Sequence, residues 1–220
     1  RPPRSTQGVS SAASDVYKRQ EKNYIDLENT LQGIFATNGV EFGLLYACEN
    51  CNELIGYVKY ILKDSDADGK NIQRGDFFTG VNGTRLTSNN YRSLLFGENL
   101  SYTLNMSSLQ SGTLISNGID VELTKEENFK TNPIQVSKTL SIPNGVKVGY
   151  LMYNQFVADI SKDLNETFAY FKTEGITELI VDLRYNGGGS VQNCVELASM
   201  ITGQYLSLIH ISEPTRPRLI

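Results

Sequence analysis

Residues 181–191 (VDLRYNGGGSV) hold the residue types and spacing best suited to chemistry. An apolar run leads into Gly187, Gly188 and Gly189, and a helix is predicted to follow from Ser190. Glycines before a helix let backbone N–H groups approach an anionic oxygen, because no Cβ blocks the approach. The loop lacks the Gly-Lys-Ser/Thr of a P-loop and the GxGxxG of a dinucleotide site. Two interpretations stay open: an anion-binding loop, or glycines that only form a tight turn.

The sequence offers few other catalytic or ligating groups. Its one histidine, His210, lies in the C-terminal flank, so residues 21–205 contain no histidine base or ligand. Cys48 and Cys51 form a CxxC, but a four-ligand zinc site cannot close without a second pair. We interpret them as loop cysteines, for which a disulfide in an oxidising compartment is one option. Cys194 is expected in the core of a helical segment.

Residues 64–69 (DSDADG) match the first half of an EF-hand calcium loop. The twelfth position should be a bidentate Glu, but it is Gly75, and Asp76 comes one residue late. We therefore predict a solvated acidic loop, and neither a metal nor another cofactor.

Hydrophobic periodicity indicates the elements that must position these groups. The second half alternates strand and helix: strands at 134–140, 147–153 and 178–183, and helices at 160–173 and 190–202, the first ended by Gly175. This order predicts a βαβ unit with parallel strands, the 178–183 strand being buried on both faces. The first half is strand-rich, with a tight turn at Asn82-Gly83. Its elements are a helix over 21–36, strands at 40–47, 54–62, 76–81, 101–106 and 118–123, and a helix over 87–96.

Two stretches resemble peptidase family S41, the C-terminal processing (tail-specific) serine peptidases. Residues 182–189 (DLRYNGGG) resemble the DLRxNPGG signature, and residues 148–156 (VGYLMYNQF) resemble a conserved strand of the family. The register is similar to members from the Bacteroidetes. The resemblance implies a crotonase-like core in which Gly188 and Gly189, with Gly188 preferred, donate backbone N–H groups to an oxyanion hole. Gly187 replaces the usual proline.

The resemblance also implies a serine nucleophile activated by a lysine, both located beyond Tyr205. Ser190 is interpreted as a helix N-cap, and Asp182 with Arg184 as a structural ion pair. The chain is therefore expected to be an inactive part of a serine-type endopeptidase.

A second resemblance, over about residues 37–123, is to a PDZ domain. Residues 72–83 (IQRGDFFTGVNG) are similar to its LKxGDxIxxVNG run. Phe42, Gly43, Leu44 and Leu45 match the carboxylate-binding loop and its strand. Such a domain binds extended peptides along a strand edge, so the implied partners are proteins or peptides with free C-termini.

The two ends, residues 1–20 and 206–220, resemble translated sequencing adapters and are left out of the fold prediction. They hold six of the 20 basic and two of the 24 acidic residues, so the part between them has 14 basic and 22 acidic residues and a formal net charge of −8. An acidic chain without basic clusters argues against nucleic acid as a partner. A periplasmic or envelope location is expected, with membrane association only through an N-terminal anchor outside this chain.

The predicted fold is α+β with an α/β second half: a PDZ-like, partly open β-barrel followed by the N-terminal part of a crotonase-like peptidase core. The predicted organisation is a helix at 21–36, a PDZ domain at 37–125 and the partial core at 130–205, between the two flanks. The alternative is a non-catalytic PDZ peptide-binding module on a crotonase-like scaffold.

Overall fold

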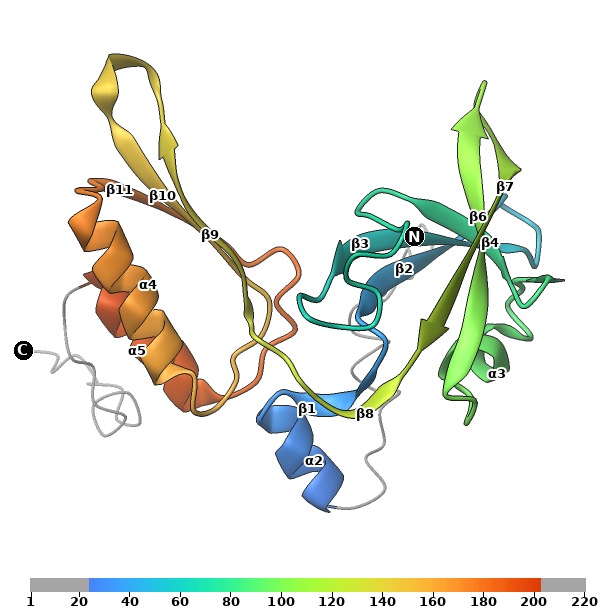
Figure 1. Ribbon diagram of the computed structural model, residues 1–220, viewed down its shortest axis with the longest axis horizontal. Helices are drawn as coiled ribbons and strands as arrows, with labels where there is room; N and C mark the ends of the chain where they lie inside the picture. The colour runs from blue at the N-terminus through green and yellow to red at the C-terminus, as the bar shows by residue number, and fades with distance from the viewer. Residues whose placement is uncertain (1–23, 203–220) are drawn as a thin grey trace, which may run out of the picture. The chain divides into compact units, whose positions relative to one another are not determined.

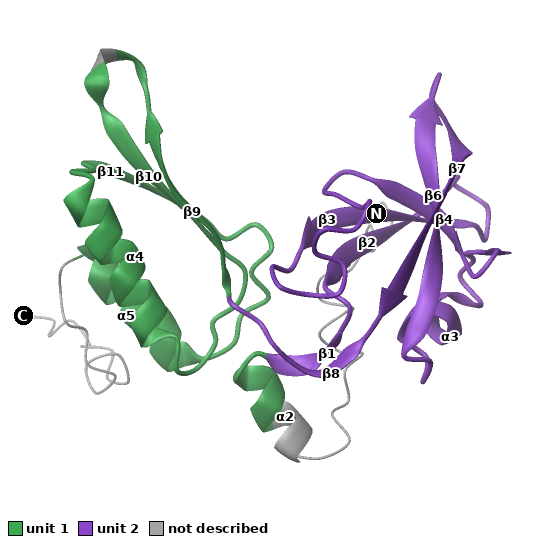
Figure 2. Ribbon diagram, viewed as in Figure 1, with its two compact units in different colours: residues 1–33, 133–220 green, residues 34–132 purple. Residues whose placement is uncertain are grey.

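The computed structural model describes residues 24–202, which form two compact units (Figure 2). One unit spans residues 34–132, and the other combines residues up to 33 with those from 133 onward. The first unit is wider than the predicted 37–125 because β1 (Ile34–Thr37) pairs antiparallel with β8 (Glu126–Lys130). No helix within residues 24–202 has the length and apolar character needed to cross a bilayer.

Unit 34–132 is built on an open, antiparallel sheet with the strand order β2-β3-β4-β6-β7, to which β5 is added beside β4 (Figure 1). The elements are β2 (Val40–Tyr46), β3 (Leu54–Ile61), β4 (Phe77–Val81), β5 (Thr84–Arg85), α3 (Tyr91–Phe96), β6 (Ser101–Gln110) and β7 (Thr113–Thr124). Among the described residues no pairing joins β2 to β7, so the sheet does not close into a barrel. The predicted turn is confirmed, because Asn82 and Gly83 have φ of 51° and 75° between paired Val81 and Thr84.

The core of this unit lies under the sheet, where alternate residues of each strand point inward. Strand β3 shows the alternation, with Leu54 and Val58 buried and their neighbours half-buried. Phe78 and Leu104 are fully buried at the centre of the cluster. The helix predicted over 87–96 begins only at Tyr91, because residues 87 and 88 bond back to the start of β3.

The second unit has a three-stranded sheet with the order β11-β10-β9. Its elements are α2 (Tyr24–Leu31), β9 (Ile134–Ser141), the 3₁₀ turn η1 (Pro143–Gly145), β10 (Lys147–Tyr153), α4 (Ser161–Thr173), β11 (Glu178–Asp182) and α5 (Val191–Thr202). Strands β10 and β11 are parallel and joined through α4, which confirms the βαβ unit. Gly175, with φ of 68°, ends α4 as predicted.

The prediction that residues 178–183 are buried on both faces is wrong. Leu179 and Val181 pack against the cluster that α4 and α5 also contact, but Ile180 is 49% exposed. Within residues 24–202, strand β11 is the edge of the sheet, and both helices pack against the same cluster. The apolar run therefore predicted the strand correctly, but it did not predict that one face of the strand is exposed.

The helix predicted over 21–36 is shorter than expected. Helix α2 ends at Leu31, and Gly33 has φ of 74° before the chain enters β1. The apolar residues Ile34 and Phe35, which continue the helical spacing, instead pair with β8. A strand partner nearly 100 residues away thus overrides the local period.

Candidate functional site

The glycine loop is fixed against the end of β10. Phe156 N–H donates to the Gly188 carbonyl (2.9 Å), and Ser190 N–H donates to the Phe156 carbonyl (2.7 Å). A Cβ on Gly189 would overlap the Phe156 carbonyl oxygen, and Gly189 also has φ of 131°. Only glycine fits at position 189 without moving one of these backbones.

The Gly188 amide, which the family resemblance favoured as the oxyanion donor, already makes a hydrogen bond. Its N–H donates to Asn186 Oδ1 (2.8 Å), while Asn186 Nδ2 donates to the Tyr153 carbonyl (3.0 Å). Asn186 therefore ties the loop to β10 and occupies this donor. The Gly189 N–H makes no hydrogen bond within residues 24–202, so it is the open donor of the pair.

Helix α5 begins directly behind the loop, and two contacts fix its start. Ser190 Oγ accepts a hydrogen bond from Asn193 N–H (3.3 Å), which confirms Ser190 as an N-cap. The Tyr153 hydroxyl donates to Asn193 Oδ1 (2.6 Å). Tyr153 is fully buried, and this burial raises the pKa of its phenol. The first turn of α5 is thus joined to the last residue of β10.

Two buried amides near the loop were not identified from the sequence. Asn154 follows β10, and neither its Oδ1 nor its Nδ2 has a hydrogen-bond partner within the described residues. Asn193 Nδ2 is buried and unpartnered within the same range. A buried amide without a partner costs about 1–3 kcal/mol. For Asn154, the only indication in the sequence is an asparagine directly after an apolar strand. That pattern does not distinguish a buried amide from an ordinary turn residue.

The predicted ion pair is present at the end of β11. Arg184 Nε and Nη2 donate to the Asp182 carboxylate (2.6 Å for Nη2 to Oδ2), and the Tyr150 hydroxyl donates to the same oxygen (2.6 Å). The Arg184 guanidinium and the Tyr150 hydroxyl together hold the pKa of Asp182 well below its usual value. Because the Asp182 side chain is 6% exposed and fully paired, its arrangement is that of a structural carboxylate.

The four residues predicted for peptide binding lie on β2, an edge strand whose only partner within residues 24–202 is β3. Phe42 and Leu44 pack against the core of the unit. Gly43 and Leu45 alternate with them and point to the other face, where Leu45 is 54% exposed. Phe42 and Leu44 therefore lie on one face of β2 beside its unpaired edge. Gly43 and Leu45 lie on the opposite face.

Helix α3 supplies aromatic residues that the sequence did not single out. The Phe96 ring lies 5.8 Å from the Phe42 ring and 6.5 Å from the Tyr91 ring, between ring centroids. Phe96 is 63% exposed although it contacts both rings. These side chains and the β2 edge form a surface, here called the β2–α3 surface, defined by Phe42, Leu44, Tyr91 and Phe96. The two aromatic residues of this short helix were the only feature of the sequence that could have indicated such a surface.

The predictions for the three cysteines had different outcomes. Cys48 and Cys51 form a disulfide in the connection between β2 and β3, as one option from the sequence had it. Cys194 is exposed, so its assignment to the core is wrong. The buried face of α5 is defined by Asn193 and Leu197, one turn apart, and Cys194 lies next to that face.

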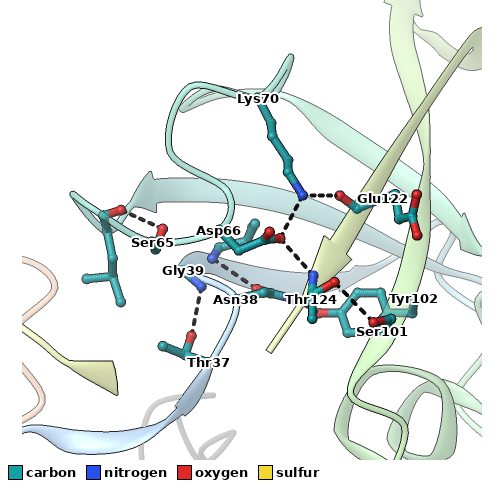
Figure 3. Close-up of polar contacts among 12 residues, drawn as sticks. Thr37, Asn38, Gly39, Ser65, Asp66, Lys70, Ser101, Tyr102, Glu122 and Thr124 are labelled. Carbon is teal, nitrogen blue, oxygen red and sulfur yellow. Dashed lines mark hydrogen bonds and ion pairs between the residues drawn. The ribbon is translucent and has the colours of Figure 1, made fainter. Parts of the chain in front are cut away.

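The acidic loop 64–69 is integrated into the unit rather than simply solvated (Figure 3). Asp66 Oδ2 accepts hydrogen bonds from Lys70 Nζ (2.7 Å) and from Thr124 N–H (2.7 Å). Lys70 Nζ also donates to the Glu122 carbonyl (2.7 Å), and Ala67 is 1% exposed. Within the described part of the chain no three His, Cys, Asp or Glu side chains are grouped to hold a metal ion. Asp66 therefore serves to attach the loop to β7.

Comparison with known proteins shows which family the region around the glycine loop is similar to. Residues 147–216 match the family model of peptidase family S41. The matched range starts at β10 and includes the whole glycine loop. A probable CtpA-like serine protease of Staphylococcus epidermidis is 25% identical over 209 residues, 94% of this chain and 40% of that protein. A carboxyl-terminal-processing protease of Picosynechococcus sp. is 31% identical over 80 residues, 36% of this chain and 19% of that protein.

A solved structure shows a similar fold. The crystal structure of a putative S41 protease from Bacteroides fragilis has a TM-score of 0.59 and 24% identity, and the match covers 80% of this chain and 50% of that one. These comparisons support the resemblance to C-terminal processing peptidases. The chain spans about 40% of the length of the staphylococcal relative.

Proposed function

We propose that this chain is part of a serine-type C-terminal processing endopeptidase, with unit 34–132 acting as a PDZ domain and the second unit as the first part of a crotonase-like catalytic core. The observation that carries the proposal is the S41 match over residues 147–216, since this range contains the strand, glycine loop and helix that would build an oxyanion site.

The proposed catalytic role of the glycine loop is to stabilise the negative oxygen formed when an acyl bond is attacked. Gly189 N–H, which is unbonded within residues 24–202, is the donor available for this role. Gly188 N–H would contribute only after Asn186 Oδ1 has moved away, because that oxygen now occupies it. Each such donor accounts for about 10²–10³ in rate. The serine and lysine of the covalent step lie outside this chain in this proposal, so the chain alone binds substrate without cleaving it.

The proposed substrates are proteins with free C-termini. A C-terminal tail would extend along the open edge of β2 as an added strand, with its last side chain against Phe42 and Phe96. The proposed location is the periplasm or cell envelope, with an anchor outside this chain. The Cys48–Cys51 disulfide supports an oxidising compartment, which thiol labelling in intact cells would test.

The test of tail binding uses the whole chain and fluorescent heptapeptides that end in the same apolar residue. One peptide carries a free C-terminal carboxylate and its partner an amide, and binding is followed by fluorescence anisotropy. We expect the free carboxylate to bind at least tenfold more tightly, because a charge-assisted hydrogen bond contributes about 1.5–3 kcal/mol. Equal affinity for the two peptides would contradict the PDZ assignment.

The second candidate function is a non-catalytic peptide-binding module on the same scaffold, which the occupied Gly188 amide favours. Reading the gene beyond residue 205 separates the two. A serine among small residues, followed about one helix later by a lysine, supports the peptidase. The absence of this pair supports the binding module.

A further inference from the structure

The Cys48–Cys51 disulfide lies in the connection between β2 and β3, and it is open to solvent on one side. Cys48 is exposed and Cys51 is half-buried, so Cys48 is the residue that a dissolved thiol reaches more easily. Accessible disulfides exchange with thiols most readily, whereas shielded ones resist reduction. The location of this bond is therefore that of a labile disulfide.

The fold closes this connection without help from the disulfide. Ala47 N–H donates to the Glu53 carbonyl (2.9 Å), and Tyr46 pairs with Leu54 in the ladder of β2 and β3. These backbone contacts already bring together the two ends of the loop that contains both cysteines. The bond itself contributes little to stability, because it closes a very short loop and the entropy that it removes grows with loop length. Reduction should therefore leave unit 34–132 folded.

The turn also accommodates the reduced form. Cys51 Sγ lies 3.3 Å from the Cys48 carbonyl oxygen. A disulfide sulfur carries no hydrogen, but a Cys51 thiol in the same place would donate to that oxygen. The exposed Cys48 side chain is then free to turn toward solvent. The same backbone thus suits both redox states, which a reversible exchange requires.

The charges of the turn discriminate between thiols that approach it. Glu49 lies between the two cysteines and makes no hydrogen bond or ion pair within residues 24–202. Glu53 is instead paired with Arg85 (2.8 Å), so its charge is compensated. The uncompensated carboxylate of Glu49 repels an anionic thiol and attracts a cationic one.

We propose that Cys48–Cys51 is a redox-active disulfide that exchanges with dithiols in the folded protein and favours cationic over anionic thiols. A thiolate of the dithiol attacks Cys48 Sγ, the Cys48–Cys51 bond breaks, and Cys51 leaves as a thiolate that takes up a proton. The second thiol of the dithiol then attacks the mixed disulfide, and Cys48 is released and takes up the second proton. Two electrons and two protons pass to the protein, and the dithiol becomes a disulfide. This inference is independent of the proposed tail binding.

The first test asks whether exchange occurs without unfolding. Cys194, which is free and exposed, is blocked with iodoacetamide, and the whole chain is then treated with dithiothreitol. Mass spectrometry follows reduction, with an oxidised peptide of residues 46–54 as the reference. We expect a rate proportional to the dithiothreitol concentration and within about tenfold of the peptide's rate, because exchange that requires unfolding would be slower by at least about 10³. Hydrogen exchange should show that residues 34–132 stay protected.

A reduction rate that levels off at high dithiothreitol concentration, or that lies further below the peptide's rate, overturns the inference. Loss of protection throughout residues 34–132 on reduction overturns it as well. Two single variants identify the sulfur that is attacked. Cys51→Ser, which leaves the exposed Cys48 thiol, should form a mixed disulfide with cystamine faster than Cys48→Ser does. The reverse order contradicts attack at Cys48.

The second test measures the charge preference. Rates with cysteamine and with glutathione are each divided by the rate of the same thiol with a small neutral disulfide at the same pH. We expect the corrected rate for cysteamine to be about two- to fivefold higher, the effect of one exposed charge, and about 0.5 M NaCl should reduce this ratio. Glu49→Gln should also reduce it, whereas Glu98→Gln, which removes an exposed carboxylate after α3, should not. Equal corrected rates, or a ratio unchanged in Glu49→Gln, overturn the preference.

Discussion

The two units differ in how completely each encloses its own core. In unit 34–132 the sheet and its connections bury one continuous cluster, with Phe78 and Leu104 almost fully inside. In the second unit a three-stranded sheet packs against two helices, while Ile180 and Leu183 at the end of β11 are 49% and 44% exposed. The proposed binding function thus resides in an enclosed unit, and the proposed oxyanion loop in a sheet whose β11 edge is unpaired within residues 24–202.

The difference also separates two ways of building a site. The β2–α3 surface uses a strand edge that is unpaired within residues 24–202 and the exposed ring of Phe96, so its chemistry is already presented to a partner. The glycine loop uses backbone amides, and one of these is taken by Asn186. A side-chain surface can be ready in the free protein, whereas a backbone donor must either be open or be released by movement of its present acceptor.

The largest expected effect tests whether the two cores are separate. Phe78→Ala should destabilise unit 34–132 by about 3–5 kcal/mol, because it empties a fully buried site. Hydrogen exchange followed by mass spectrometry should show lost protection in residues 34–132 only. Phe171→Ala, in the other core, is the matched control and should affect only residues 24–33 and 133–202. Loss of protection in both units after either substitution would contradict the division.

The next effect distinguishes the glycines of the loop. Gly189→Ala should destabilise the second unit by about 3 kcal/mol, because the new Cβ overlaps the Phe156 carbonyl and φ is 131°. Gly187→Ala is the control, since its Cβ would meet no atom of the described residues within 4 Å and its φ is not positive. It should be neutral or stabilising by about 0.4–1 kcal/mol. Urea unfolding measures both, and equal effects would show that the loop is not held as described.

The smallest effect concerns the pH dependence of the stability of each unit. Arg184 and Tyr150 lower the pKa of Asp182, so its contribution to stability is complete above the unfolded value of about 3.9 and is lost as the pH falls below it. Asp182→Asn should therefore cost about 2 kcal/mol at pH 7, measured by urea unfolding, and progressively less below about pH 4.

Asp66→Asn provides the comparison in the other unit. Burial raises the pKa of Asp66, but its hydrogen bonds to Lys70 and Thr124 outweigh this and lower it overall. The cost of Asp66→Asn to the free energy of unfolding should also decrease as the pH falls, and it should be smaller than the cost of Asp182→Asn. A cost of Asp182→Asn that does not change between pH 7 and pH 3 would show that Asp182 contributes no pH-dependent stability.

Local sequence was sufficient for most elements of the second unit. Strand β10, helix α4 and the turn at Gly175 follow from hydrophobic period and glycine chemistry, which act over a few residues. The prediction was weaker where distant residues compete. Ile34 and Phe35 continue a helical pattern but pair with β8, and Cys194 lies one position away from the buried face of α5.

The candidate site divides in the same way. Local residue types were enough to predict that a glycine loop links β11 to a capped helix and that Asp182 and Arg184 pair, because these features depend on neighbours along the chain. Three features became visible only in the folded chain: Asn186 occupies the Gly188 amide, Phe156 excludes a side chain at position 189, and α3 brings Phe96 to Phe42. Hydrogen-bond direction and side-chain proximity depend on segments that meet only after folding, and no local pattern encodes them.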